Sequence, residues 1–122
     1  MITVILPYPP SANRLWRNGK GATYKSAEYV AWLAEAQAAI PMQARGQIRG
    51  PHSVLIEVDR PSRALRDIDN RAKPIMDSLK DQKYLKGVIR DDSDTVQITI
   101  RWTGAEPVKP ARVRVTVTPE KM

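Results

Sequence analysis

The chain has 122 residues with no cysteine and one histidine, and its 20 lysines and arginines against 13 acidic residues give a formal net charge of +7. This length is enough for one hydrophobic core but not for two, so we expect a single domain over residues 1–122. The absence of cysteine excludes a disulfide framework and a thiolate zinc site, and a lone histidine excludes the usual zinc and haem centres. Any metal is therefore expected to be a hard cation with oxygen ligands.

The excess positive charge favours nucleic acid as the partner, because a positive surface attracts phosphate backbones. No apolar run approaches the roughly 20 residues that span a bilayer. The first ten residues lack the charged leader and small-residue cleavage site of a signal peptide. We therefore expect a soluble, cytoplasmic protein with no membrane partner.

The N-terminal part of the chain predicts a strand followed by a basic loop. Residues 2–6 are rich in β-branched side chains and run into the proline-rich PYPP, which is typical of a strand entering an extended segment. The loop that follows interleaves basic and aromatic side chains, which suits contact with phosphates and bases; alternatively, its aromatic residues anchor it to the core. The residues concerned are Arg14, Trp16, Arg17, Lys20, Tyr24 and Lys25.

A helix is predicted next, with Ser26 as its N-cap and Pro41 at its end. Tyr29 and Trp32 are expected to belong to the core rather than to a ligand site. The positions at helical spacing that predict the inward face are Val30, Leu33, Ala34 and Gln37.

The rest of the chain predicts a strand over residues 53–59, a second helix, and two final strands over residues 95–102 and 111–118. Asp69 is expected to cap the second helix, and Pro74 moves its start beyond Asn70. Its inward positions are Ala72, Ile75, Met76 and Leu79.

The two final strands alternate apolar and polar residues with a period of two. We expect them to form an antiparallel pair that is half covered by helices. Their inward positions are predicted to be Val96, Ile98, Ile100, Trp102, Val113, Val115 and Val117. The fold class is therefore α+β, in the order β-α-β-α-β-β, with one mixed sheet packed against two helices.

The segment RDIDNRAKPIMD holds the pattern that most strongly suggests chemistry. Asp67 and Asp69 are two residues apart, so on an extended backbone both carboxylates project from the same side and can share one cation. Mg²⁺ takes two or three carboxylates and keeps several waters. A third carboxylate is available in RDDSD, at Asp91, Asp92 or Asp94. Lys73, one helical turn after Asp69, is placed to orient a nucleophile or to stabilise charge on a phosphate.

A simpler interpretation of the same residues remains open. Asp67 and Asp69 then serve as a helix cap and a partner of the helix dipole, with ion pairs to Arg66 and Arg71, and RDDSD is only a polar turn. Short motifs of this kind arise by chance, so composition and spacing do not decide between the two.

Three stretches, in this order, resemble the RusA family of Holliday junction resolvases: LPYPPSANRLWR, RDIDNRAKPIMDSLKD and IRDDSDTV. The resemblance extends over nearly the whole chain. Its most specific part is the pattern D-[LI]-D-N-x-x-K-x-x-x-D followed by a pair of aspartates. This sequence matches that pattern at Asp67, Ile68, Asp69, Asn70, Lys73, Asp77, Asp91 and Asp92.

The resemblance implies a small homodimeric endonuclease that depends on Mg²⁺, or alternatively Mn²⁺, and that nicks two strands of a four-way DNA junction symmetrically. It implies that Asp67, Asp69 and Asp92 hold the metal and that Lys73 is catalytic. Arg66 matches a basic residue that contacts a phosphate, and we expect Arg71 and the basic loop to bind DNA as well. The metal-binding side chains are expected to be held in position by three further residues that do not bind the metal themselves: Asn70, Asp77 and Asp91.

Other functions are compatible with the same residues. One is a nuclease of this fold that prefers flaps, forks or other branched DNA. Another is a branched-DNA-binding module that has lost catalysis, although such a protein would gain affinity by losing acidic charge near phosphates. A basic structural or RNA-binding protein does not explain the joint spacing of the aspartates and Lys73.

Overall fold

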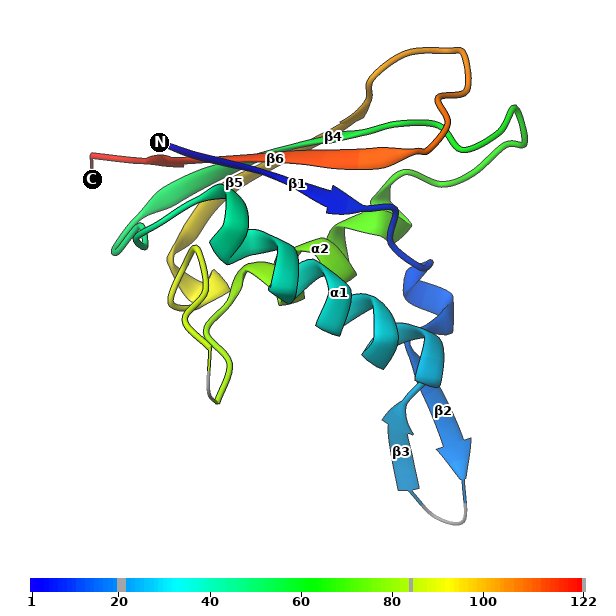
Figure 1. Cartoon of the computed structure of the whole chain (residues 1–122), viewed down its shortest axis with the longest axis horizontal. Coiled ribbons are helices and arrows are strands. Elements are labelled where there is room, and N and C mark those ends of the chain that lie inside the picture. Colours follow the sequence, from blue (N-terminus) through cyan, green and yellow to red (C-terminus); the bar gives the residue numbers. More distant parts are fainter. Residues whose placement is uncertain (20–21, 84, 122) are drawn as a thin grey trace.

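The computed structural model describes residues 1–19, 22–83 and 85–121. Four strands form one mixed sheet in the order β1-β6-β4-β5, and β2 and β3 form a separate hairpin. Both α-helices lie on one face of the sheet, so the predicted α+β class is confirmed (Figure 1). No helix in the described part of the chain is long and apolar enough to cross a membrane. The elements are β1 Ile2–Pro7, β2 Trp16–Gly19, β3 Ala22–Lys25, α1 Ala27–Gln43, β4 His52–Val58, α2 Ala72–Leu79, β5 Thr95–Trp102 and β6 Arg112–Pro119.

Helix α1 begins as predicted, because the Ser26 hydroxyl accepts a hydrogen bond from the Tyr29 backbone N–H at 3.1 Å. It does not end at Pro41 but continues to Gln43. Pro41 is in the last turn, where a missing backbone donor disturbs few hydrogen bonds. Of the predicted inward positions, Leu33 is buried, but Val30 is 53% exposed, Ala34 is exposed and Gln37 is only partly buried. The expected core positions of Tyr29 and Trp32 are confirmed. The buried side chains are Tyr29, Trp32, Leu33, Ala36 and Ile40.

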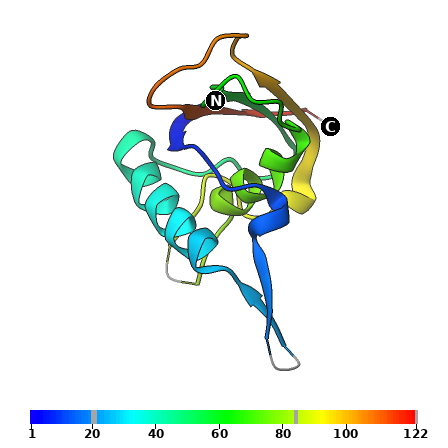
Figure 2. The same cartoon turned by 90° about the vertical axis from the view of Figure 1, so that its right-hand side faces the viewer.

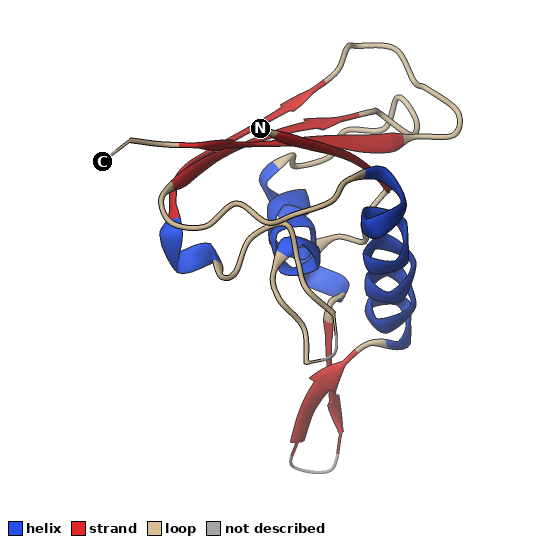
Figure 3. Ribbon diagram, turned by 60° about the vertical axis from the view of Figure 1, so that its left-hand side comes forward, coloured by secondary structure: helices blue, strands red, loops and turns tan. Residues whose placement is uncertain are grey.

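The sheet corrects the predicted pairing of the last two strands. β5 pairs in parallel with β4, and β6 lies between β1 and β4 and is antiparallel to both, so β5 and β6 are not neighbours. The sheet and the helices form separate layers (Figure 3). A parallel pair needs a long crossover connection, and the segment with α2 supplies it between β4 and β5. The valines of β6 are buried as predicted, whereas Val96 and Ile98 are 47% and 46% exposed because β5 is at the edge of the sheet.

The basic segment predicted as a loop is the hairpin β2–β3, which projects away from the sheet and helices (Figure 2). The two strands pair from Trp16 with Lys25 to Gly19 with Ala22, and the Thr23 hydroxyl donates to the side-chain oxygen of its partner Asn18 at 3.0 Å. Trp16 is 48% exposed, so it does not anchor the hairpin to the core.

After helix α2, the chain turns back and packs against the C-terminal end of the helix. The helix starts at Ala72, after a 3₁₀ turn over Asp69–Arg71, so Pro74 is in the first turn as expected. The Ile89 N–H donates to the Leu79 carbonyl at 3.1 Å. Gly87 packs so closely that an added Cβ would lie 2.1 Å from the same carbonyl oxygen. Only glycine fits there without movement of the backbone.

Replacing Gly87 by alanine should therefore destabilise the protein by about 1–3 kcal/mol, the usual range for overpacking. Gly104→Ala is the matched control, because a Cβ at Gly104 meets no heavy atom within 4 Å. The free energies of unfolding from urea titrations measure both effects. Equal stability of the two variants would show that the chain does not approach the end of α2 this closely.

Candidate functional site

Asp67 and Asp69 lie in the segment that connects β4 to α2, and both are exposed. Asp69 is the first residue of the 3₁₀ turn, and neither that turn nor α2 has a side-chain hydrogen bond at its start. The prediction that Asp69 caps the helix is therefore wrong. The backbone at Ile68 and Arg71 is already helical, whereas a capping residue is normally extended.

The neighbouring arginines do not neutralise these carboxylates. Arg66 donates to the Ser62 hydroxyl at 2.7 Å and to the Ala64 carbonyl at 3.2 Å. Arg71 stacks on the Tyr8 ring, with its guanidinium carbon 5.2 Å from the ring centre. Within residues 1–19, 22–83 and 85–121, neither Asp67 nor Asp69 has an ion pair or a side-chain hydrogen bond. The simpler interpretation, in which ion pairs with these two arginines hold the aspartates, is therefore wrong for the described structure.

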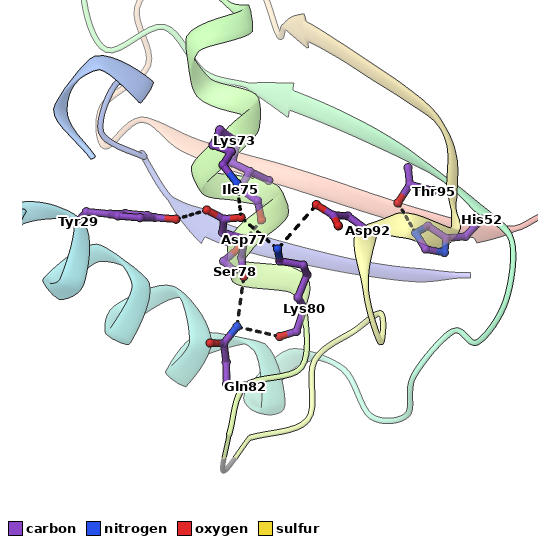
Figure 4. Close-up of polar contacts among 10 residues, drawn as sticks. All are labelled: Tyr29, His52, Lys73, Ile75, Asp77, Ser78, Lys80, Gln82, Asp92 and Thr95. Atoms are coloured by element: carbon purple, nitrogen blue, oxygen red, sulfur yellow. Dashed lines mark hydrogen bonds and ion pairs between the residues drawn. The ribbon is translucent and has the colours of Figure 1, made fainter. Parts of the chain in front are cut away.

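Asp77 is the centre of a polar network that joins α1 to α2 (Figure 4). Its Oδ2 accepts a hydrogen bond from the Tyr29 hydroxyl, and its Oδ1 accepts one from Lys73 Nζ at 3.0 Å. Lys80 Nζ lies 3.4 Å from the same Oδ1. Asp77 therefore fixes Lys73, which the sequence predicted to be catalytic, from one turn further along the helix.

The pKa values in this network follow from burial and charge. Burial acts to raise the pKa of Asp77, but the hydrogen bonds from Tyr29 and Lys73 and the positive charges of Lys73 and Lys80 outweigh it, so the pKa is lowered. Burial, together with the adjacent carboxylate, raises the pKa of Tyr29 far above its ordinary value. Tyr29 thus remains a hydrogen-bond donor, and Asp77 remains charged.

Lys80 connects this network to the second acidic segment and was missed by the sequence analysis. Its Nζ lies 3.7 Å from Asp92 Oδ2 as well as near Asp77. Burial acts to lower the pKa of Lys80, but the two carboxylates raise it above its ordinary value. The available signal was its position three residues after Asp77, which places both side chains on one side of the helix.

The three aspartates of RDDSD have different partners, although the sequence suggested one acidic group. Asp92 faces Lys80, and Asp94 lies 3.6 Å from Arg90. The Ser93 hydroxyl lowers the pKa of Asp91 by hydrogen bonding, with help from backbone groups of the same turn. Asp92 is therefore the aspartate of this segment that reaches Lys80 at the end of α2.

The oxygen donors suit a hard cation, but they do not form a closed site. Among the residues described, no group of three carboxylate or imidazole side chains is placed to hold a metal ion. The structure brings Lys73, Asp77, Lys80 and Asp92 together, whereas Asp67 and Asp69 have no ion-pair partner among the described residues. The assignment of Asp67, Asp69 and Asp92 as metal ligands, and the supporting role of Asn70, stay predictions.

The predicted DNA-binding residues occupy two places. Arg17 and Lys25 are exposed on the hairpin, where Lys25 Nζ lies 5.8 Å from the Tyr29 ring centre. Arg14, Arg66 and Arg71 line one cavity at the base of the hairpin. Lys20 and the side chain of Tyr24 lie outside the described residues.

Asp77→Asn should remove a pH-dependent part of the stability. Because the folded-state pKa of Asp77 lies below the ordinary value of 3.8, the stability supplied by its charged form is full above that pH and is lost as the pH falls through the lowered pKa. We expect the variant to be about 1–3 kcal/mol less stable than the wild type at pH 7, the range for hydrogen bonds to charged groups, and the difference to shrink at pH 3.

Urea unfolding at the two pH values measures this difference. Glu120→Gln is the control, since Glu120 is exposed and has no ion pair in the described part of the chain. A difference between Asp77→Asn and the wild type that is as large at pH 3 as at pH 7 would show that the charged carboxylate is not the stabilising form.

Comparison with known proteins assigns the chain to a family. The family model described as Endodeoxyribonuclease RusA matches residues 7–118. The crossover junction endodeoxyribonuclease RusA of Escherichia coli strain K12 is 32% identical over 118 residues, which cover 95% of this chain and 92% of that protein. The protein of the same name from Enterobacteria phage 82 is 32% identical over 120 residues, covering 94% and 92%. The match includes the aspartate motif, the network of Asp77 and the hairpin, and the chain belongs to the RusA family of endodeoxyribonucleases.

Proposed function

We propose that this protein is a metal-dependent endodeoxyribonuclease that resolves four-way DNA junctions by paired symmetric nicks, and that it acts in recombination and repair in the cytoplasm. The observation that supports this best is the pair of exposed carboxylates, Asp67 and Asp69, without cationic partners in the described structure of a protein with a net charge of +7. Like charges so close together are most easily explained by a cation that is bound during function.

Mg²⁺ is the proposed ion, with Mn²⁺ as the alternative. Asp67 and Asp69 would hold it, and Asp92 would supply a third carboxylate. When bound, such an ion lowers the pKa of a coordinated water and offsets negative charge on the phosphate. The carboxylate oxygens fit this role by their chemistry, and the present contact of Asp92 with Lys80 is long enough, at 3.7 Å, to be exchanged.

Lys73 and Lys80 are proposed to act on the substrate phosphate. The side chain of Lys73 is 56% exposed, so its ammonium remains accessible while Asp77 holds it by a hydrogen bond of 3.0 Å. Tyr29 holds Asp77 in turn from α1. An ammonium fixed in this way stabilises negative charge on a phosphate without having to reorganise first. Asn70 and Asp91 are proposed to support the neighbouring carboxylates from their turns.

A homodimer is part of this proposal, since a junction has two-fold symmetry and two opposed nicks need two sites. The free edge of β5 is the surface that fits a second copy of the chain. The other edge, at β1, is blocked by Gln43, whose side chain bonds the backbone N–H and carbonyl of Ile5 at 2.7 and 2.6 Å. No described side chain bonds the β5 backbone in this way, and the exposed Val96 and Ile98 lie on that strand.

The alternative functions differ in which branched DNA the protein cuts and in whether it cuts DNA at all. A nuclease for flaps or forks would use the same carboxylates, and a module that only binds branched DNA would not need them. Incubation of the purified protein with a synthetic four-way junction, a matched duplex and a flap, each with Mg²⁺ or EDTA, separates these functions. Paired nicks in the junction alone that EDTA abolishes support the proposal; junction binding without any metal-dependent nick contradicts it.

Asp67→Asn should lower junction cleavage roughly 100-fold or more, because it removes a metal ligand. Junction binding in EDTA should be unchanged or tighter, because one negative charge near the phosphates is lost. Asp94→Asn is the control, since Asp94 belongs to an acidic turn but pairs with Arg90. Cleavage by Asp67→Asn at the rate of the control would remove the basis for the metal site.

Ile98→Glu should convert a dimer into a monomer, because a charge on the edge strand opposes pairing with another copy. Val30→Glu is the matched control, as Val30 is exposed to a similar degree on α1. Sedimentation velocity measures the mass of each variant. A dimer that persists in Ile98→Glu would place the interface elsewhere.

A further inference from the structure

A cavity beside the candidate active site contains a buried arginine that lacks an acceptor. The cavity, of about 690 Å³, lies between the segment after β1, the first half of α1 and the segment that precedes α2. Its lining includes Tyr8, Arg14, Trp32, Arg66 and Arg71. Arg71 is only 8% exposed, which is rare for a charged side chain without an ion pair.

The guanidinium of Arg71 has no hydrogen bond and no ion pair with any described residue. It stacks on Tyr8, with its guanidinium carbon 5.2 Å from the ring centre. Within the described part of the chain, its Nε and the neighbouring Tyr8 hydroxyl are fully enclosed and have no hydrogen-bond partner. The terminal Nη groups are not enclosed in this way, and they have no acceptor among the described residues either. A buried charge without a partner is strongly unfavourable, so this arrangement favours the binding of an anion.

The charges around the cavity favour one small anion on the arginine side. Arg66 uses only neutral acceptors, the Ser62 hydroxyl and the Ala64 carbonyl, so its charge is not offset. Glu28 and Glu35, on α1, also line the cavity, and neither forms an ion pair with the arginines in the described structure. Three arginines and two glutamates leave a formal charge of +1. A single phosphodiester group, with one negative charge, matches that balance.

We propose that Arg71, stacked on Tyr8, binds one backbone phosphate of the DNA substrate that is not the phosphate being cleaved. Arg71 follows Asp69 by two residues, which is at most about 7 Å of extended chain. Asp69 and Arg71 belong to the same 3₁₀ turn, so their side chains serve neighbouring parts of one substrate strand. The bound phosphate is therefore expected within a few nucleotides of the scissile bond, and Arg71 is a positioning residue that sets the register of the strand over Asp67 and Asp69. This inference rests on the proposed nuclease function.

A set of three substitutions and a control tests the proposal. Arg71→Met removes the charge and keeps much of the volume, Arg71→Lys keeps the charge but loses the planar pair of donors, and Tyr8→Phe removes only the hydroxyl. Arg63→Gln is the control for loss of one positive charge, because Arg63 pairs with Glu106 on the surface and does not line the cavity. Thermal melts identify any variant that is not folded.

The first measurement is the affinity for a four-way junction in EDTA at several salt concentrations. Arg71→Met should bind about 10-fold more weakly than the wild type, and the slope of log K against log salt should be shallower by about 0.9, the value for one phosphate contact. Arg71→Lys should keep the slope and lose part of the affinity. Tyr8→Phe should bind about 2- to 5-fold more weakly. Unchanged affinity and slope in folded Arg71→Met would overturn the proposal.

The second measurement locates the phosphate. In a series of junctions, one phosphate near the nick is replaced in turn by a neutral methylphosphonate. The wild type and Arg63→Gln should lose affinity at one position within a few nucleotides of the nick, and Arg71→Met should not respond to that position. Equal responses of Arg71→Met and the wild type at every position would overturn the proposal, and they would show that water alone fills the space beside Arg71 and Tyr8.

The two proposals fail in different ways. Cleavage of the unmodified junction by the wild type with Mg²⁺ tests the nuclease function and does not depend on Arg71. If the wild type cleaves and no position depends on Arg71, the phosphate site is wrong and the nuclease function stands. If the wild type does not cleave the junction, the nuclease function fails, and with it the register assigned to Arg71.

Discussion

The carboxylate of Asp77 is the group on which the candidate active site depends. It is half-buried between the two helices, and it accepts from Tyr29 on α1 while it holds Lys73 and Lys80 on and just after α2. Burial alone would favour its neutral form, and the three donors reverse that preference. The same contacts that keep Asp77 charged therefore fix the position of two lysines and join the helices.

The sheet and the return of the chain after α2 place this network beside the second acidic segment. Because β5 runs parallel to β4, the connection through α2 must cross the sheet before β5 begins, and the turn with Asp92 lies at that point. Gly87 lets the chain pass against the end of α2, which brings Lys80 within 3.7 Å of Asp92. Residues 12 positions apart in the sequence thus meet at one end of the helix.

The carboxylates and the arginines of the candidate site lie in separate places. Asp67 and Asp69 are left without cationic partners among the residues described, although two arginines adjoin them in the sequence. Arg66 and Arg71 turn toward the cavity below the hairpin instead. This separation is what the proposed metal site at the carboxylates and the proposed phosphate contacts of the arginines both need.

Local features of the sequence determined the helix cap at Ser26, the late start of α2 and the four strands of the main sheet, because capping, proline geometry and period-two alternation act over a few residues. The aspartate motif was also visible in the sequence, whereas the hairpin β2–β3 was not predicted. Strand order was decided only by tertiary structure, since β4 bonds both β5 and β6, which come much later in the chain. Tertiary structure alone also decided the contacts of Lys80 and the cavity at Arg71. Their roles come from neighbours distant in the sequence, and no local pattern encodes those contacts.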